Sequence, residues 1–315
     1  MNAKASRRYL LVTPCRDEGR YLRRTLDSVL AQSTPPAKWI IVNDGSTDDS
    51  GEILAEYAAK HPDILHILTL SNAQRAKRDL DAAKEIEAFY EGLDLVSLDD
   101  YPYLCKLDAD LDLPPRYFER AMERMEEDPF LGNVSGKMVE PQPDGSLRPF
   151  MMGDENAIGA VKFYRTQCFR EIGGFVRWLA WDGIDGHLCR MHGWIAMSVH
   201  DPEMEFIHLR PMGSSEGDII HGRERWGRGK YMMSSAWYYV AAASVFRMKE
   251  PPIGKGGFHI FKGYVDAVKK AQKRYENPEY QSYVRRFELE QLVFGKGRAA
   301  RWANRKIRQG MPKAK

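Results

Sequence analysis

The chain has 315 residues, of which 43% are hydrophobic and 29% charged, so it is long enough to bury one large core or two smaller ones. It begins with polar and basic residues and has no apolar run of about 18 residues, so we expect neither a secretion signal nor a membrane-spanning helix. The four cysteines have no paired spacing, which favours buried thiols in a reducing compartment: Cys15, Cys105, Cys168 and Cys189.

The net charge of +3 conceals an uneven distribution of charge along the chain. Residues 222–315 contain 22 Lys and Arg against 7 Asp and Glu, a net charge of +15, and residues 1–221 contain 25 against 37, a net charge of −12. The basic C-terminal region therefore predicts an anionic partner. Nucleic acid and an anionic membrane both fit this charge, but no nucleic-acid-binding module is recognisable, so we expect no nucleic acid and favour a membrane surface.

The first part of the chain alternates between apolar strand-like runs and amphipathic helix-like stretches. The apolar runs predict buried strands at Tyr9–Thr13, Trp39–Val42, Ile64–Leu70 and Tyr101–Leu107. The stretches between them predict helices at Tyr21–Leu30, Ile53–Ala59 and Ala76–Tyr90. This alternation predicts an α/β fold with a mostly parallel sheet and right-handed crossovers.

Past Asp112 the pattern becomes less regular. Pro114 and Pro115 predict the start of another helix, and Pro141–Met152 has the composition of a loop. Further strands are predicted at Asn133–Val139, Ile158–Tyr164 and Trp194–Val199, and helices at Cys168–Phe175 and Trp181–Gly193. Beyond His208 the chain predicts helices at Ser234–Arg247, at Lys262–Tyr275 and from Tyr280 onward, then a frayed basic end at Lys296–Lys315. We therefore expect one domain over residues 1–230, with halves at 1–112 and 113–230, and a basic helical region at 231–315.

Acidic residues follow two of the predicted strands. Asp44 comes after Trp39–Val42, and Asp108 and Asp110 come after Tyr101–Leu107. Side chains two apart on an extended segment point the same way, so Asp108 and Asp110 can face one site, about 6–7 Å apart along the chain. Open α/β sheets bind ligands at the carboxyl ends of their strands, and hard divalent cations prefer oxygen ligands. We therefore expect a metal-assisted site for a nucleotide or diphosphate rather than two solvated acidic turns.

The turn that contains Asp44 allows two structures. Asp44 followed by Gly45 favours a tight hairpin. Alternatively, Asp49 or Ser50 caps a following helix, with Glu52 at capping-box distance from Asp49. We favour the helix, in which Asp44 can accept hydrogen bonds from a base N–H or a ribose hydroxyl.

Three segments together carry a resemblance to a known family: Thr13–Glu18, Val42–Asp48 and Leu107–Asp110. In this order and spacing they resemble the nucleotide-binding half of inverting family 2 glycosyltransferases, which have the Rossmann-like GT-A fold. The resemblance implies that Pro14 and Glu18 line the nucleoside pocket and that Asp44 contacts the base.

The resemblance also implies a metal-dependent donor site with Mg²⁺ or Mn²⁺. Asp108 and Asp110 would serve the ribose, the metal and the diphosphate, and we count Asp108 among the donor-binding residues and Asp110 among the metal ligands. Arg16, from the first segment, is counted with the donor-binding residues.

A second resemblance lies in the acceptor half. The turn Ile172–Phe175 precedes Trp181 and Asp182, at the place where the family usually has a Glu-Asp pair. The pair is not reproduced, so either Asp182 or Asp185 can be the base that takes the proton from the acceptor hydroxyl in an inverting transfer.

Residues near the end of the first domain complete the predicted site. His208 is a candidate third metal ligand or a diphosphate contact, and Arg225 and Arg228 are candidate diphosphate ligands. Arg225 and Trp226 resemble the end of the Gln-x-x-Arg-Trp motif of processive polysaccharide synthases, but Gly222 stands at the Gln position. We therefore expect transfer of a single sugar.

The basic C-terminal region has the composition of a membrane-surface segment. Trp237, Tyr238, Tyr239 and Phe246 are expected at headgroup level, with Arg247 and Lys249 on phosphates. We expect the protein in the cytoplasm, on the inner face of the plasma membrane.

By resemblance, the expected activity is transfer of one sugar from a nucleotide sugar, with inversion, in bacterial cell-surface polysaccharide synthesis. The expected acceptor is a glycan linked to a polyprenyl diphosphate. The alternatives are a polyprenyl-phosphate sugar synthase and a degenerate GT-A protein that binds without catalysis.

Overall fold

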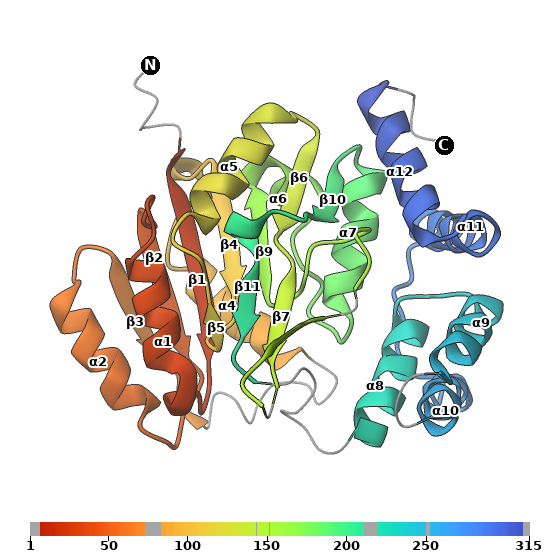
Figure 1. Cartoon of the computed structure of the whole chain (residues 1–315), viewed down its shortest axis with the longest axis horizontal. Helices are drawn as coiled ribbons and strands as arrows, with labels where there is room; N and C mark the ends of the chain where they lie inside the picture. The colour runs from red at the N-terminus through yellow and green to blue at the C-terminus, as the bar shows by residue number, and fades with distance from the viewer. Residues whose placement is uncertain are drawn as a thin grey trace.

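Two β-sheets form the centre of the computed structural model, which describes residues 7–72, 83–142, 144–150, 152–210, 219–249 and 253–310 (Figure 1). The larger sheet contains β1 (Tyr9–Cys15), β2 (Lys38–Asn43), β3 (Leu65–Thr69), β4 (Tyr103–Leu107), β6 (Leu131–Ser135), β9 (Val161–Arg165) and β10 (Ile195–Ser198). The smaller sheet contains β5 (Leu111–Asp112), β7 (Met138–Pro141), β8 (Leu147–Pro149) and β11 (Phe206–His208). The strand orders are β10-β6-β9-β4-β1-β2-β3 and β5-β11-β7-β8.

The larger sheet is mostly parallel, as the alternation of elements predicts. β4, β1, β2 and β3 are parallel neighbours, and β10 is parallel to β6. β9 runs antiparallel between β4 and β6. The carboxyl ends of β1, β2 and β4 therefore lie along one edge, where the acidic residues were expected.

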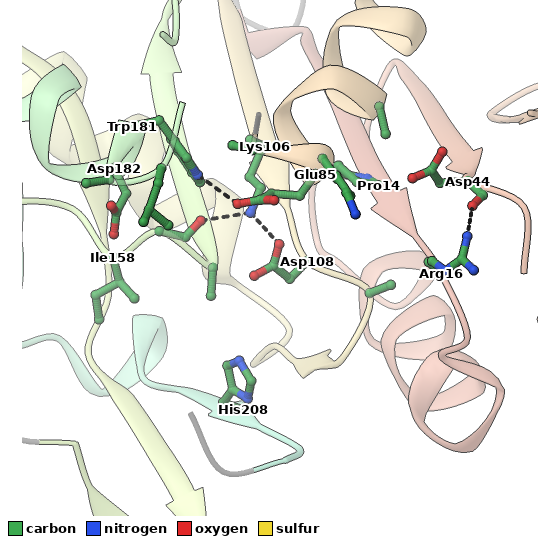
Figure 2. Close-up of a pocket in the computed structure, with 18 of the residues that line it drawn as sticks. Pro14, Arg16, Asp44, Glu85, Lys106, Asp108, Ile158, Trp181, Asp182 and His208 are labelled. Atoms are coloured by element: carbon green, nitrogen blue, oxygen red, sulfur yellow. Dashed lines mark hydrogen bonds and ion pairs between the residues drawn. The ribbon is translucent and has the colours of Figure 1, made fainter. Parts of the chain in front are cut away.

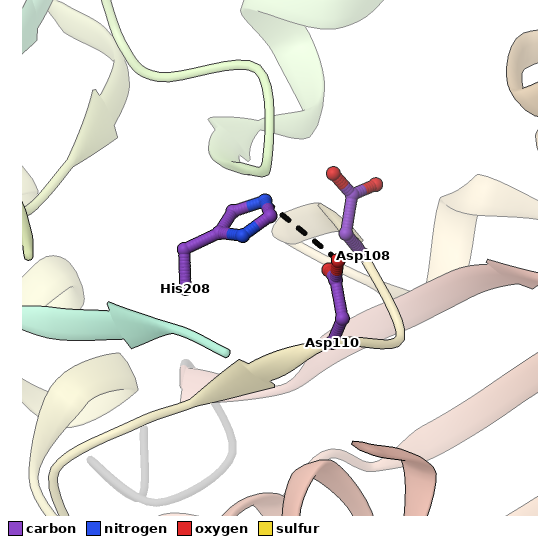
Figure 3. A group of neighbouring side chains, drawn as sticks. All are labelled: Asp108, Asp110 and His208. Atoms are coloured by element: carbon purple, nitrogen blue, oxygen red, sulfur yellow. Dashed lines mark ion pairs between the residues drawn. The ribbon is translucent and has the colours of Figure 1, made fainter. Parts of the chain in front are cut away.

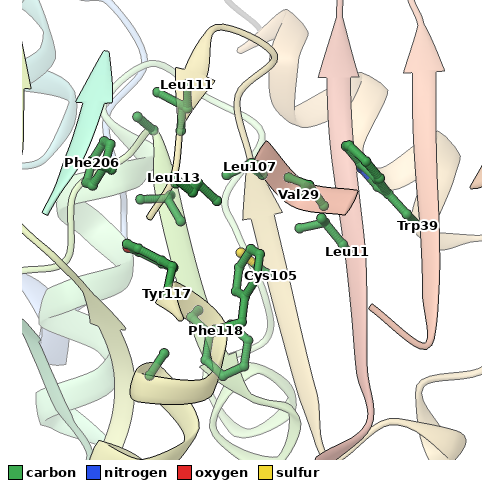
Figure 4. Close-up of a cluster of buried hydrophobic side chains, with 14 of the residues drawn as sticks. Leu11, Val29, Trp39, Cys105, Leu107, Leu111, Leu113, Tyr117, Phe118 and Phe206 are labelled. Atoms are coloured by element: carbon green, nitrogen blue, oxygen red, sulfur yellow. The ribbon is translucent and has the colours of Figure 1, made fainter. Parts of the chain in front are cut away.

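Helices cover both faces of the larger sheet. One face carries α1 (Gly19–Leu30), α2 (Ser50–Lys60) and α5 (Tyr117–Glu127), and the other carries α4 (Lys84–Leu93), α6 (Thr166–Glu171) and α7 (Trp181–Met191). Alternate strand residues enter the two cores, so Leu11 packs with α1 and α5 (Figure 4). Val12 packs with α4 on the other face. Burial of each such aliphatic side chain contributes about 1.5–3 kcal/mol.

Five helices follow the sheets: α8 (Ile219–Met232), α9 (Trp237–Arg247), α10 (Lys255–Lys269), α11 (Pro278–Phe294) and α12 (Lys296–Arg308). They lie together beside α7, at the blue side of Figure 1. α11 buries Tyr280 and Val284 in the same core as α4, α6 and α7, so the basic region packs directly on the sheet domain. Two short 3-10 helices, η2 (Leu98–Asp100) and η3 (Pro202–Met204), complete the elements described. Among the described helices, none is both long and apolar enough to cross a bilayer.

The strand predicted at Asn133–Val139 is two strands in different sheets. β6 ends at Ser135, and β7 begins at Met138. Between them a Cβ on Gly136 would lie 1.6 Å from the carbonyl oxygen of Met204, so only glycine fits this crossing of the chain.

The prediction of a frayed end at Lys296–Lys315 was wrong for most of the segment, because residues 296–308 form α12. Ala299 and Ala300 pack against Phe287, and Arg308 is paired with Asp128 at 2.7 Å. The predicted loop Pro141–Met152 contains β8, which pairs with β7. Of the helix predicted at Ala76–Tyr90, residues 76–82 lie outside the described residues, and α4 ends three residues later, at Leu93.

Candidate active site

A cavity of about 650 Å³ opens at the carboxyl ends of β1, β2 and β4 (Figure 2). Nine of the residues predicted for the site line it: Pro14, Arg16, Glu18, Asp44, Asp108, Asp182, His208, Arg225 and Arg228. Figure 2 shows Asp44 at one side, Asp182 at the other, and Asp108 with His208 between them. Asp110 and Asp185 are not part of the lining, and the structure gives them different surroundings.

Hydrogen bonds between the two loops that follow β1 and β2 form the side of the cavity that contains Asp44. Arg16 Nη1 donates to the carbonyl oxygen of Asp44 at 2.8 Å. Asp17, in the left-handed region at φ 51°, accepts from the backbone N–H of Thr47 at 2.6 Å. These contacts hold the Asp44 turn against the β1 loop.

The cap of α2 differs from the prediction. Asp49 occupies the N-cap position but makes no side-chain cap hydrogen bond. Asp48 provides the carboxylate instead, accepting from the N–H of Ser50 at 3.0 Å and from the N–H of Gly19, at the start of α1, at 2.8 Å. One side chain therefore ties the starts of both helices to the same loop pair.

Three side chains form a group that can hold a metal ion: Asp108, Asp110 and His208 (Figure 3). Each offers one ligand atom, and these atoms lie within 4.8 Å of one another. β11 pairs antiparallel with β5, with His208 opposite Leu111, and this pairing brings His208 to the residues that follow β4. The sequence separation of about 100 residues is thus closed by the smaller sheet.

The hydrogen bonding of His208 leaves one ring nitrogen for a metal. Nδ1 lies 2.6 Å from the carbonyl oxygen of Arg210, and a carbonyl only accepts, so Nδ1 carries the hydrogen. In the neutral imidazole Nε2 then has the lone pair, and this atom lies 3.8 Å from Asp110 Oδ2. A histidine whose other nitrogen donates to a carbonyl is the usual arrangement for a metal ligand.

Asp110 also fits a cation. Its side chain is 1% exposed, and its Oδ2 is ion-paired with the Nε of Arg210 at 2.7 Å. Within the described residues its Oδ1 accepts no hydrogen bond, and a buried carboxylate oxygen without a donor favours a further cation. Two carboxylates and an imidazole form a donor set that a divalent ion accepts.

Arg210 is a site residue that the sequence did not single out. Its Nε lies 2.7 Å from Asp110 Oδ2, and its Nη2 donates to Glu18 Oε1 at 2.8 Å. Burial raises the pKa of Glu18 to about 8, with Arg210 opposing the rise and Asp110 and Asp108 adding to it. Glu18 and Arg210 are 192 positions apart, and no sequence pattern connects them.

Lys106 is a second residue that the sequence prediction missed. It is buried in β4, donates to Asp108, and also donates to the carbonyl oxygen of Gly159 at 3.0 Å. Burial raises the pKa of Asp108, and the ammonium of Lys106 opposes that rise. A lysine inside an otherwise apolar strand was the available signal.

Asp182 and Asp185 lie on the same helix, α7, in different environments. Asp182 is half-buried, in the first turn, and lines the cavity, where a Cβ on Gly159 would lie 3.1 Å from its Oδ2. Asp185 is 1% exposed and pairs through both oxygens with Lys162 at 2.6 Å. It also accepts from the hydroxyl of Tyr164, and burial raises its pKa while Lys162 opposes this.

The basic wall of the cavity comes from α8. Arg225 and Arg228 are three residues apart, so they project from neighbouring positions of one helix face. Arg228 Nε is buried and has no hydrogen-bond acceptor within the described residues. A buried donor that lines the same cavity as the acidic group suits an anionic oxygen.

Residues 10–178 match the family model described as "Glycosyl transferase family 2". The chain belongs to glycosyl transferase family 2. The match covers β1 to β9 and the motifs around Asp44 and Asp108, so the family resemblance is confirmed.

Two curated relatives match parts of this family 2 chain. Glycosyltransferase GlyA of Streptococcus pneumoniae serotype 4 is 40% identical over 57 residues, which are 18% of this chain and 8% of that protein. Poly-beta-1,6-N-acetyl-D-glucosamine synthase of Staphylococcus epidermidis is 33% identical over 125 residues, which are 39% of this chain and 26% of that protein. The chain thus spans at most about a quarter of the length of these relatives.

Solved structures share the fold of this family 2 glycosyltransferase over nearly its whole length. The mannosyltransferase PcManGT from Pyrobaculum calidifontis, in complex with GDP-Man and Mn²⁺, has a TM-score of 0.52 at 16% identity and covers 97% of this chain and 88% of its own. Residues 1–349 of S. aureus TarS, in complex with UDP-GlcNAc, have a TM-score of 0.52 at 12% identity and cover 96% and 92%. The predicted GT-A fold with C-terminal helices is confirmed.

Proposed function

We propose that this family 2 glycosyltransferase moves a single sugar, with inversion, from a nucleotide sugar to a saccharide carried on a polyprenyl diphosphate. The observation that carries the proposal is the order of groups along one cavity: Asp44, then Asp108 and His208, which group with the buried Asp110, then Asp182. This order matches the order of parts in a nucleotide sugar bound next to an acceptor. The acidic group suits the diphosphate and its metal, and the carboxylate beyond it suits the sugar and acceptor.

The donor end is proposed to bind the nucleoside. Pro14, Arg16 and Glu18 line this end with Asp44, whose carboxylate can accept from a base N–H. Relatives guide the choice of donor, because PcManGT was solved with GDP-Man and TarS with UDP-GlcNAc. These two nucleotide sugars are the first candidates.

The residues at the centre are proposed to stabilise the leaving group. Asp110 and His208, with Asp108 beside them, would hold a divalent cation, which when bound would supply positive charge near the departing diphosphate. Arg225 and Arg228 add two guanidinium groups from the part of the lining that α8 forms. Their donors can pair with phosphate oxygens as negative charge builds on them.

Asp182 is proposed to be the base, and Asp185 to position α7. As the acceptor oxygen forms its bond to the anomeric carbon, Asp182 takes the hydroxyl proton and the bond to the diphosphate oxygen breaks with its electron pair. Asp185 lies outside the cavity lining, and its carboxylate is already paired with Lys162. Lys162 also donates to the carbonyl oxygen of Asp182 at 2.8 Å, so the pair fixes the start of the helix.

The biological setting is part of the same proposal. We place the enzyme in bacterial cell-surface polysaccharide synthesis, on the inner face of the plasma membrane. A relative that is named a polysaccharide synthase supports the pathway class, and the basic region after residue 222 supports a membrane-bound acceptor.

A donor screen followed by product analysis tests the proposal. UDP-, GDP- and dTDP-sugars are compared by thermal shift with Mg²⁺, Mn²⁺ or EDTA, and the best donor is then incubated with membrane lipid extracts. The expected product is a lipid-linked saccharide longer by one sugar, whose anomeric configuration, read by NMR, is opposite to that of the donor. Retained configuration refutes inversion, a glycosylated polyprenyl monophosphate refutes the saccharide acceptor, and nucleotide binding without transfer refutes catalysis.

A further inference from the structure

Exposed large apolar side chains are concentrated on the C-terminal helices. Among the described residues, sixteen such side chains are more than a third exposed; eleven of them belong to α9–α12, and two more, Met248 and Ile253, lie between α9 and α10. Leu95, Leu147 and Met152 are the exceptions. Such a concentration on one part of a folded chain marks an interaction surface.

Three of these exposed residues lie near the end of α9, just before α10 and in the first turn of α10. Phe246 is 68% exposed, Ile253 78% and Phe258 58%, and we call these three residues the α9–α10 tip. The two helices are in direct contact here, because a Cβ on Gly257 would lie 2.2 Å from the carbonyl oxygen of Ser244. The tip is therefore part of a packed pair of helices.

The apolar surface continues along α10. Phe258, Phe261 and Val268 are all exposed and fall within one helical stripe, while Ile260 and Ala267 on the other side are buried. Lys255, Lys262 and Lys269 recur every seven residues beside the apolar stripe, and Lys262 is paired with Glu224 at 2.9 Å and Asp266 at 3.2 Å. An apolar stripe with aromatic residues next to lysines is the pattern of a helix that lies in a membrane interface.

The charge of this surface decides between two occupants. Residues 237–270 contain six Lys and Arg against two Asp and Glu, a net charge of +4. A second copy of the chain docking face to face would bring two such surfaces together, and lysine is depleted in protein interfaces. An anionic bilayer offers opposite charge and an apolar interior in the same place.

The same helices reach the cavity. α8 carries Arg225, Arg228 and Met232 in the cavity wall. It packs on α10 at very short range, since a Cβ on Gly227 would lie 1.9 Å from the carbonyl oxygen of Ile260. Figure 1 shows α8, α9 and α10 as one group of helices. A bilayer that holds α9 and α10 therefore also holds one wall of the active site near its surface.

We propose that the α9–α10 tip and the apolar stripe of α10 insert into the headgroup region of an anionic bilayer. This surface differs from the one expected from the sequence, because Tyr239 is buried and Phe258 and Ile253 take its place. This docking surface rests on the proposed function, because an enzyme with a lipid-linked acceptor works at a membrane. Binding to the membrane can nevertheless be tested without any acceptor.

Vesicle flotation of the full chain tests the surface. Vesicles of phosphatidylcholine with or without phosphatidylglycerol are used, and they contain neither saccharide nor nucleotide. The protein is expected to float with the anionic vesicles at low salt and to stay in solution with the neutral ones or at high salt. No flotation with anionic vesicles at low salt overturns the proposal.

Matched double variants test the residues. Phe246→Ser with Phe258→Ser is expected to weaken binding about tenfold or more, and Lys255→Gln with Lys269→Gln about 25-fold, at about fivefold for each charge. Leu95→Ser with Leu147→Ser removes two exposed apolar side chains elsewhere and is expected to bind as the wild type does. Unfolding curves establish that all three pairs fold. Equal binding by the Phe pair and the wild type overturns insertion.

Light scattering tests the alternative occupant of this surface, which is a second copy of the chain. If the wild type dimerises in solution and the Phe pair does not, while neither floats, the surface is a contact between copies and the membrane proposal is wrong. Asp182→Asn is expected to float as the wild type does. Loss of transfer in every acceptor assay with intact flotation refutes the proposed function and leaves the docking surface standing.

Discussion

Substituting the two acids of α7 separately is the most direct test of the site. Asp185→Asn removes the partner of Lys162, whose side chain is 0% exposed. Removing one member of a buried ion pair costs about 3–5 kcal/mol, because the remaining charge stays desolvated. At about 2 °C per kcal/mol for a large domain, the melting temperature should fall by roughly 6–10 °C.

Asp182→Asn should have the opposite profile. Asp182 is half-buried at the cavity, and its carboxylate has no ion pair in the described part of the chain, so the unfolding free energy should change by less than about 1 kcal/mol. Its turnover should fall by about 10²–10⁴-fold, which is the usual contribution of a general base. Donor binding should remain, since Asp182 lies at the far side of the cavity from Asp44.

The assay pairs urea unfolding with initial rates of nucleoside diphosphate release in the presence of acceptor. A double variant, Lys162→Met with Asp185→Leu, is the control, because an apolar pair of similar size should be more stable than Asp185→Asn. Full turnover in Asp182→Asn, or a stable Asp185→Asn that has lost turnover and keeps donor binding, refutes the assignment.

Three further predictions concern residues at or beside the proposed metal site: His208, Arg210 and Glu18. His208→Ala should weaken Mn²⁺ binding by about 100-fold or more in calorimetry, because even residues that orient metal ligands contribute 10–100-fold, and His66→Ala on β3 should leave it unchanged. Arg210→Met should lower the unfolding free energy in EDTA by about 3 kcal/mol, since Glu18 and Asp110 lose their shared cation, and Mn²⁺ should restore part of it; an equal loss with and without Mn²⁺ contradicts this reasoning. Because the pKa of Glu18 is about 8 in the fold and about 4.5 when unfolded, the native state binds the extra proton and loses stability as pH rises between these values. Between pH 5 and pH 8 in EDTA, the unfolding free energy of Glu18→Gln should therefore rise relative to that of the wild type by up to about 1.4 kcal/mol per pH unit. If urea unfolding gives the same difference between variant and wild type at both pH values, the mechanism is ruled out.

The parts of the site that the sequence predicted are those that depend on strand ends. Asp44 and Asp108 each follow an apolar run, and parallel strands in one sheet end at one edge. Their meeting in a cavity therefore needed only the alternation of strands and helices. The family model over residues 10–178 covers the same part of the chain.

The parts that the sequence left open depend on helix phase and on long-range contacts. Asp182 and Asp185 are three residues apart on α7, so either can face the cavity until the packing of the helix is known. Arg210 is paired with Glu18, which is 192 positions away in the sequence. The buried Lys162 is paired with Asp185, which is 23 positions away. Such pairs form because buried charges need partners, but one sequence does not say which partner is within reach.

For the C-terminal region, too, some properties follow from the sequence and others only from the structure. Its positive charge and aromatic content follow from composition alone. Which aromatic residues are exposed follows from the contacts of α8, α9 and α10, where glycines at 227, 257 and 263 allow the helices to approach closely. A helix buries the face that its neighbours cover. Tyr239 lies on a covered face and is buried, whereas Phe258 lies on an uncovered face and is exposed.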